Sequence, residues 1–107
     1  MRLEHYSLEK LKAEITNLVG RHLDLNTHQL FFFGSRVLGR GDERSDIDVG
    51  VKGPAPVSLS VLAEIEEELA DLPILYKIDF VDFNQVSGDF RQVVGKNIEP
   101  IYTVTNV

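Results

Sequence analysis

Residues 30–51 read LFFFGSRVLGRGDERSDIDVGV, and this stretch decides how the chain folds. It opens with four apolar residues, 30–33, which predict a short buried strand that ends at Gly34. It closes with residues 46–51, where polar and apolar side chains alternate as they do along a second strand. The residues between the two runs, 35–45, predict a loop, which their two glycines favour.

The second run places two carboxylates on one face of its strand. Asp46 and Asp48 are two residues apart, so their side chains point the same way with Cα atoms roughly 7 Å apart. The apolar residues of this run point to the other side, toward a core: Ile47, Val49 and Val51. A later apolar run, Ile74–Phe83, predicts a third strand and carries Asp79. If the two strands are neighbours, three carboxylates face one point.

Asp82 competes with Asp79 for the third position. Alternation along the strand groups Asp79 with Val81 and Phe83, whereas Asp82 falls on the other face. Only one of the two aspartates can therefore share a face with the first pair. We choose Asp79 because it lies nearer the centre of the predicted strand.

Three neighbouring carboxylates do not stabilise a fold by themselves, because two unit charges 4 Å apart repel by roughly 4 kcal/mol at an effective dielectric constant near 20. Mg²⁺ reverses the sign of this energy and binds through one or two carboxylates plus substrate phosphates. Beside them, the backbone N–H groups of the Gly34–Ser35 turn can approach phosphate oxygens, and the serine hydroxyl adds a donor. Three arginines can neutralise the outer phosphates: Arg36, Arg40 and Arg44.

The rest of the chain predicts helices around this centre. Ser7 caps an amphipathic helix, and Ser58 or Ser60 caps another. Residues 84–96 are weakly helical, and residues 98–104 form a last strand or a tail on the core. The order α-β-β-α-β-α predicts an α+β fold, a small mixed sheet with helices mainly on one face.

Composition bounds the function. A length of 107 residues, with 43% hydrophobic and 26% charged residues, predicts one soluble domain over residues 1–107. The net charge of −6 argues against a protein that binds nucleic-acid phosphates through clustered Lys and Arg. The absence of cysteine excludes disulfides and thiolate metal sites. No apolar stretch has the length of a membrane span, and we expect a cytoplasmic protein.

The spacing of these residues resembles the nucleotidyltransferase superfamily of the DNA polymerase beta type, and within it the minimal nucleotidyltransferase (MNT) proteins. Gly34–Ser35, a ten-residue gap, Ser45–Asp48 and the later Asp79 all stand where that family has them. The resemblance begins at the strand from Leu30 and covers most of the chain. In one departure, Leu38 stands where family members, which often have Gly-Ser-Arg-Ala-Arg-Gly, carry a second arginine.

The resemblance implies the nucleotidyltransferase fold and a role for each residue. Asp46 and Asp48 would bind metal, and Asp79 would complete the metal site and orient the attacking hydroxyl. The nucleotide phosphates would lie against a set of four residues: Gly34, Ser35, Arg36 and Ser45. The expected reaction needs two Mg²⁺ ions and transfers a nucleotide, AMP from ATP, to a hydroxyl.

The acceptor has to come from a partner or from a second copy of the chain, so the oligomeric state stays open. MNT proteins commonly occur beside HEPN-domain ribonuclease toxins as their antitoxins. The resemblance therefore implies a HEPN-domain partner that carries the acceptor hydroxyl. The alternative is a binding module that neutralises or regulates a partner by contact alone. A third interpretation, a transferase acting on a small molecule such as an aminoglycoside, usually requires an additional domain.

Overall fold

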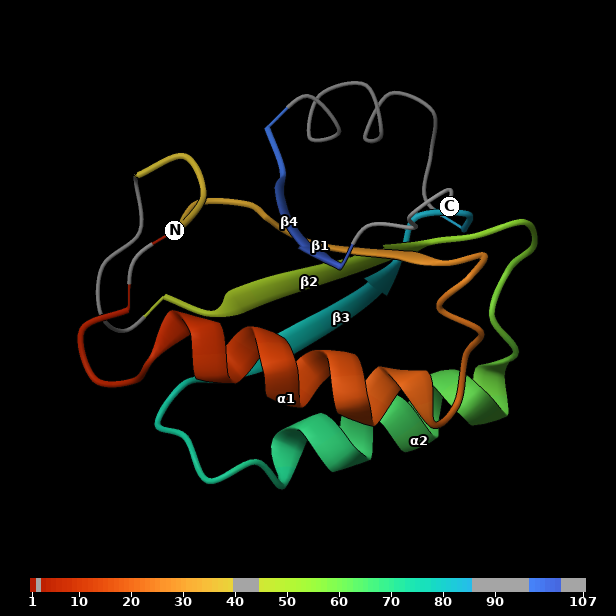
Figure 1. The fold of residues 1–107 in the computed structure, drawn as a ribbon, viewed down its shortest axis with the longest axis horizontal. Helices are drawn as coiled ribbons and strands as arrows, with labels where there is room; N and C mark the ends of the chain where they lie inside the picture. The colour runs from red at the N-terminus through yellow and green to blue at the C-terminus, as the bar shows by residue number, and fades with distance from the viewer. Residues whose placement is uncertain (2, 40–44, 86–96, 103–107) are drawn as a thin grey trace.

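A computed structural model describes residues 1, 3–39, 45–85 and 97–102 of the chain. These residues form a four-stranded sheet and two helices (Figure 1). In chain order the elements are α1 (Leu8–Gly20), β1 (Gln29–Phe33), β2 (Ile47–Lys52), α2 (Leu59–Ala70), β3 (Ile78–Asp82) and β4 (Glu99–Tyr102).

The sheet is mixed, with the strand order β3-β2-β1-β4. The central strand β1 pairs antiparallel with β2 and β4, whereas β2 and β3 run parallel. A parallel pair needs a crossover connection, and α2 supplies it. Both helices lie on the same face of the sheet in Figure 1. The predicted α+β fold, a mixed sheet with helices mainly on one face, is therefore confirmed.

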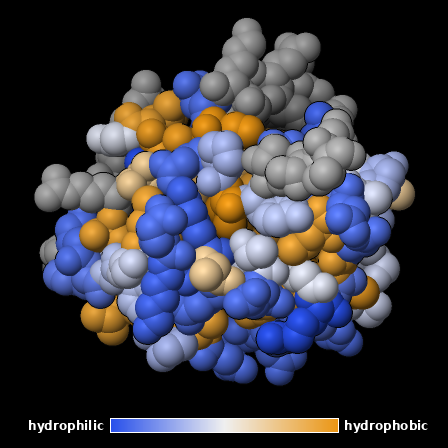
Figure 2. All heavy atoms as spheres, viewed as in Figure 1, coloured by the Kyte–Doolittle hydropathy of each residue, from blue (hydrophilic) through white to orange (hydrophobic). Residues whose placement is uncertain are grey.

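Each helix begins at a capping serine. The Ser7 hydroxyl accepts a hydrogen bond from the Lys10 N–H at 3.2 Å, and the Ser58 hydroxyl accepts one from the Val61 N–H at 3.3 Å. The cap of α2 is therefore Ser58. Hydrophilic side chains cover much of the outward side of the helices in Figure 2, as their amphipathic patterns predict. Neither described helix is long and apolar enough to cross a membrane.

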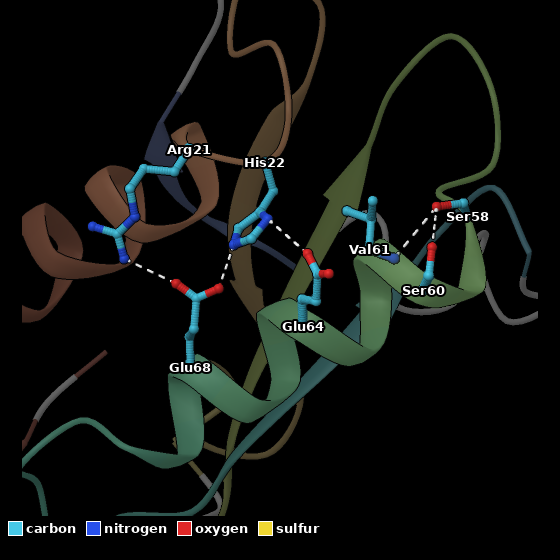
Figure 3. Close-up of polar contacts among 7 residues, drawn as sticks. All are labelled: Arg21, His22, Ser58, Ser60, Val61, Glu64 and Glu68. Carbon is cyan, nitrogen blue, oxygen red and sulfur yellow. Dashed lines mark hydrogen bonds and ion pairs between the residues drawn. The ribbon is translucent and has the colours of Figure 1, made fainter.

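The two helices are tied together by ion pairs near the end of α1 (Figure 3). Arg21 donates to Glu68 at 3.0 Å, and His22 lies 3.4 Å from Glu64 and also contacts Glu68. Hydrogen bonds from Arg21 and His22 lower the pKa of the Glu68 carboxyl. The acidic side of α2 therefore holds α1 in place.

The face of the sheet under the helices, the core face, is apolar as predicted. The alternating residues of β2 that were expected to face the core are fully buried: Ile47, Val49 and Val51. They belong to one cluster with buried residues of both helices: Leu11, Ile15, Ile65 and Leu69. Burying these side chains supplies most of the free energy that holds the layers together, at about 1.5–3 kcal/mol for each large aliphatic side chain.

The opposite side of the sheet, here the Phe/Asp face, carries Phe31, Phe33, Asp48 and Asp79. Both phenylalanines pack edge-on against Phe83, with ring centroids 4.8 Å and 5.0 Å from it. Phe31 lies directly over the backbone of its β2 partner Gly50, where an added Cβ would come within 2.4 Å of the ring. The three phenylalanines therefore form an aromatic cluster on the same face as the two aspartates.

The third strand differs from its prediction at its start. We expected a strand over residues 74–83, but β3 begins at Ile78. After Pro73 the backbone turns, and the Ile74 N–H donates to the Leu72 carbonyl at 2.8 Å. The predicted last strand is present as β4, and most of the predicted helix, residues 86–96, lies outside the described residues.

Candidate active site

The turn after β1 requires glycine for two reasons. First, Gly34 has a φ of +85°, which residues with side chains rarely adopt. The carbonyl of Gly34 closes the turn by accepting a 3.2 Å hydrogen bond from the Leu38 N–H. A Cβ at residue 34 would also lie 2.2 Å from Oδ2 of Asp48. The Asp48 carboxylate therefore lies directly against the backbone of the turn. Ser35 is exposed next to it.

Asp48 and Asp79 occupy neighbouring positions of the parallel pair β2–β3. Paired residues of adjacent strands point to the same face, so both carboxylates lie on the Phe/Asp face. Burial, followed by repulsion from Asp79 and then from Asp46, raises the pKa of Asp48 above its ordinary value. The three aspartates that the sequence singled out therefore share one electrostatic environment.

Asp82 has a different setting. It is 4% exposed, and its Oδ2 accepts hydrogen bonds from the Val57 N–H at 2.7 Å and from the Gln85 side-chain amide at 2.9 Å. Its Oδ1 accepts one from the Asn84 N–H at 2.9 Å. These donors tie the end of β3 to the segment before α2. The aspartate beside Asp48 is Asp79, whose side chain is 42% exposed.

Arg36 was expected to contact phosphates, and in the structure its side chain contacts other residues of the chain. Its side chain is buried, and its Nε donates to the carbonyl of Ser45 at 2.8 Å. Its guanidinium lies 4.8 Å from the ring centroid of Tyr76, and Nη1 is 3.8 Å from a Glu4 carboxylate oxygen. Arg36 therefore braces the two ends of the loop between β1 and β2.

The same hydrogen bond also involves the backbone of Ser45. The carbonyl of Ser45 belongs to the peptide bond that leads into Asp46, so Arg36 holds the backbone at the entry to the carboxylates. The other two candidate arginines, Arg40 and Arg44, lie outside the described residues. Leu38, in the position where an arginine was expected, is 44% exposed.

A pocket of about 890 Å³ opens beside the carboxylates. On the Phe/Asp face it is lined by Phe33, Gly34, Asp48 and Asp79. Beyond β3 it reaches Tyr76 and Lys77 and two residues of α2, Glu66 and Ala70.

The sequence analysis did not select Tyr76 or Lys77. Lys77 is 73% exposed, and its Nζ is 3.8 Å from Oδ1 of Asp79. Its position two residues before Asp79, on the same side of an extended segment, was the signal that could have identified it.

The donors at this site suit a hard divalent cation. Among the described residues, no three His, Cys, Asp or Glu side chains lie close enough together to enclose a metal ion. The carboxylates nevertheless meet the requirement of Mg²⁺, which takes one or two of them and fills its other positions with phosphate oxygens and water. Burial is the largest cause of the raised pKa of Asp48, and its second cause, repulsion from Asp79 and Asp46, is one that a bound cation would offset.

Comparison with known proteins gives a consistent picture. Residues 13–105 match the family described as "Polymerase beta, Nucleotidyltransferase". The "Probable protein adenylyltransferase MntA" of Haemophilus influenzae is 26% identical over 69 residues, which make up 64% of this chain and 60% of that protein. This chain thus spans only three fifths of the length of that relative.

Two solved structures share the fold. One is a toxin-antitoxin crystal structure with AMP-PNP, which matches with a TM-score of 0.70 and 22% identity over 85% of this chain and 72% of that one. The other is the tri-AMPylated HEPN toxin of Shewanella oneidensis in complex with an MNT antitoxin, with a TM-score of 0.66 and 20% identity over 89% of this chain and 72% of that one.

Proposed function

The chain belongs to the polymerase beta nucleotidyltransferase family, and from this membership we propose that it transfers a nucleotide, AMP from ATP, to a hydroxyl acceptor. The observation that carries the proposal is the placement of Asp48 and Asp79 on adjacent strands, with Asp46 nearby and the Gly34 backbone against them. Since ATP is the donor, the proposed reaction belongs to the cytoplasm.

The proposed roles differ between the residues that bind the nucleotide and the residue that acts on the acceptor hydroxyl. Asp46 and Asp48 would hold two Mg²⁺ ions, and Asp79 would complete this set. When bound, these ions neutralise the triphosphate and lower the pKa of the attacking hydroxyl. The N–H groups of the turn and the Ser35 hydroxyl hold the outer phosphates in a fixed position.

The transfer step conserves atoms and electrons. The acceptor oxygen forms a bond to the α-phosphorus, and the bond from that phosphorus to the oxygen bridging to the β-phosphate breaks. Pyrophosphate leaves with the electron pair of that bond. Asp79, at the exposed edge of the cluster, accepts the proton of the hydroxyl and passes it to solvent. The Lys77 ammonium lies 3.8 Å from this carboxylate.

The phosphate contacts expected for Arg36 and Ser45 stay predictions, and the contact between the two residues supports a positioning role in addition. The hydrogen bond from Arg36 to the Ser45 carbonyl fixes the start of β2, and thereby the direction of the Asp46 side chain. Such outer partners of metal ligands commonly change metal affinity or activity by about 10–100-fold when they are altered. We therefore propose that Arg36 has a positioning role.

The acceptor hydroxyl is proposed to lie on a HEPN-domain protein, which makes the chain an antitoxin of the adenylyltransferase type. Support comes from the MntA relative, named a probable protein adenylyltransferase, and from the MNT antitoxin structure that contains an AMPylated HEPN toxin. The candidate site agrees with this class of reaction because it combines carboxylates with an open pocket.

A second function, neutralisation by contact alone, is favoured by one observation. Leu38 is 44% exposed in the loop where family members often carry a cation. An exposed leucine suits a protein contact better than a triphosphate contact.

Labelled ATP and the Asp48→Asn variant separate the two functions. The chain and a purified HEPN-domain protein are incubated with Mg²⁺ and with ATP labelled at the α- or the γ-phosphate. We expect α-label on the HEPN-domain protein and γ-label in pyrophosphate, with transfer reduced at least about 100-fold in Asp48→Asn although the complex still forms. Neutralisation that is equal in both proteins, without transferred label, would support contact alone.

A further inference from the structure

One edge of the sheet is open next to the carboxylates. Among the four described strands, β3 lies at the end of the sheet and its neighbour is β2. The Ile47 N–H donates to the Lys77 carbonyl at 2.8 Å, and the Phe83 N–H donates to the Val51 carbonyl at 2.9 Å. In a parallel ladder with this register, every second residue from 77 to 83 bonds to β2. The residues between them therefore direct their backbone groups outward.

Next to Asp79, the outward backbone groups belong to its two neighbours, Ile78 and Phe80. Within the part of the chain that the structure describes, no hydrogen bond reaches their N–H or C=O groups. At the end of the strand the Asp82 carbonyl accepts from the Gln85 N–H at 3.0 Å, which closes the edge there. The opposite edge of the sheet, β4, contains Pro100, which has no N–H to offer.

Space is available on both sides of this edge. The pocket beside β3 is lined by Gly34 and Asp48 on the Phe/Asp face and by Glu66 and Ala70 of α2 beyond the strand. Figure 1 shows β3 at the margin of the sheet, with α2 packed on the core face. A strand added to β3 therefore has room for side chains that point alternately to the carboxylates and to α2.

We infer that this edge of β3 binds an extended segment of the acceptor protein as an additional antiparallel strand, with the acceptor hydroxyl on the residue opposite Asp79. The inference rests on the proposed function and names how its substrate is held. Because the backbone groups of Asp79 bond to β2, the residue opposite it forms a non-hydrogen-bonded pair. In such pairs the Cα atoms are only about 4.5 Å apart and the side chains are closest. A serine, threonine or tyrosine there directs its hydroxyl to the face that carries the carboxylate.

The charge of the pocket indicates which kind of segment binds along this edge of β3. The pocket carries three carboxylates, Asp48, Glu66 and Asp79, on a chain of net charge −6, so a segment with flanking lysines or arginines is favoured. A second copy of the chain, paired β3 to β3 across this point, would bring Asp79 against its own counterpart. The two carboxylates would repel each other, which disfavours this pairing.

Synthetic peptides test the inference. Nine-residue peptides of alternating valine and lysine, with serine, threonine or tyrosine at the centre, are titrated into the isotope-labelled chain with Mg²⁺ and AMP-PNP. Backbone amide shifts of Ile78 and Phe80 report binding. One set is N-methylated at the two residues that flank the centre, whose N–H groups would meet β3. The matched control set is N-methylated two residues from the centre, where the N–H groups would point away.

We expect the unmodified and control peptides to shift both amides, and the flank-methylated peptides to bind at least about tenfold more weakly. In the presence of α-labelled ATP, the first two sets should also accept AMP on the central residue. Peptides that bind in this register without accepting AMP would support the docking edge and contradict the proposed activity. The inference is overturned if both methylated sets bind equally, if no peptide shifts these amides, or if the shifts depend on protein concentration alone.

Discussion

Asp48 and Asp82 lie on adjacent strands of one sheet, and the protein treats their carboxylates in opposite ways. Asp82 is buried and accepts hydrogen bonds from Val57, Asn84 and Gln85. Asp48 has no hydrogen-bond donor among the described residues and lies near two other carboxylates, which help to raise its pKa.

The difference separates two uses of the same side chain. A buried carboxylate that stabilises the fold accepts hydrogen bonds, because a buried charge without partners is costly. A carboxylate that is left with like charges instead of donors lowers stability, and its benefit has to come from something that binds there. Asp48, which is repelled by Asp79 and Asp46, belongs to this second kind.

Replacing Asp82 should lower stability and replacing Asp48 should not, and this difference is the largest effect we expect. Asp82→Ala leaves the Val57 and Asn84 N–H groups without their acceptor and should lower the free energy of unfolding by about 3 kcal/mol. Asp48→Asn removes a repelled charge and should leave stability equal or higher. Urea denaturation at pH 7 measures both. A loss of the same size in both variants would contradict the distinction.

We expect the next largest effect from the contacts of Arg36, which brace the loop between β1 and β2. Arg36→Lys keeps the positive charge but loses the Nε donor to Ser45 and the planar contact with Tyr76. We expect the Mg²⁺ concentration for half-maximal nucleotide transfer to rise about 10–100-fold, measured from initial rates.

Arg21→Lys is the matched control for the brace, since Arg21 also pairs with a carboxylate but lies in the contact between the helices. Its Mg²⁺ dependence should equal that of the unmodified chain. An equal shift in both variants would mean that Arg36 acts through general stability rather than through the start of β2.

The smallest effect is the dependence of stability on pH. Because the pKa of Asp48 is raised in the folded chain, the folded state binds this proton more tightly than the unfolded state does. Ionisation of Asp48 therefore costs stability: the cost is absent below about pH 4 and grows as the pH rises through the folded-state pKa. Thermal unfolding of the unmodified chain and of Asp48→Asn across this range should diverge as the pH rises. Parallel curves would contradict the cause that we assign.

Much of the fold could be predicted from local patterns. The alternation over residues 46–51 placed three apolar side chains in the core, and Ser7 began a helix where its spacing predicted one. The positions of Asp48 and Asp79 followed from strand periodicity and from one assumption, that their strands are neighbours.

Other features depend on contacts between distant segments, which local patterns do not contain. Burial of Arg36 requires Tyr76 and Glu4 to come together around it, and nothing near Arg36 in the sequence indicates this. The late start of β3 has a similar cause, because the turn after Pro73 redirects an apolar stretch that periodicity alone assigns to a strand. Lys77 follows this turn, directly before β3, and lines the pocket.

One measurement tests most directly whether the three aspartates form a single cation site: a ¹³C NMR titration of the Asp48 carboxyl. It is recorded for the unmodified chain and for Asp79→Asn, each with and without Mg²⁺ and AMP-PNP. We expect a pKa above the ordinary aspartate value without ligand, a lower pKa in Asp79→Asn, and a further decrease when Mg²⁺ and the nucleotide are added. An Asp48 pKa that is ordinary and that neither change moves would contradict the account.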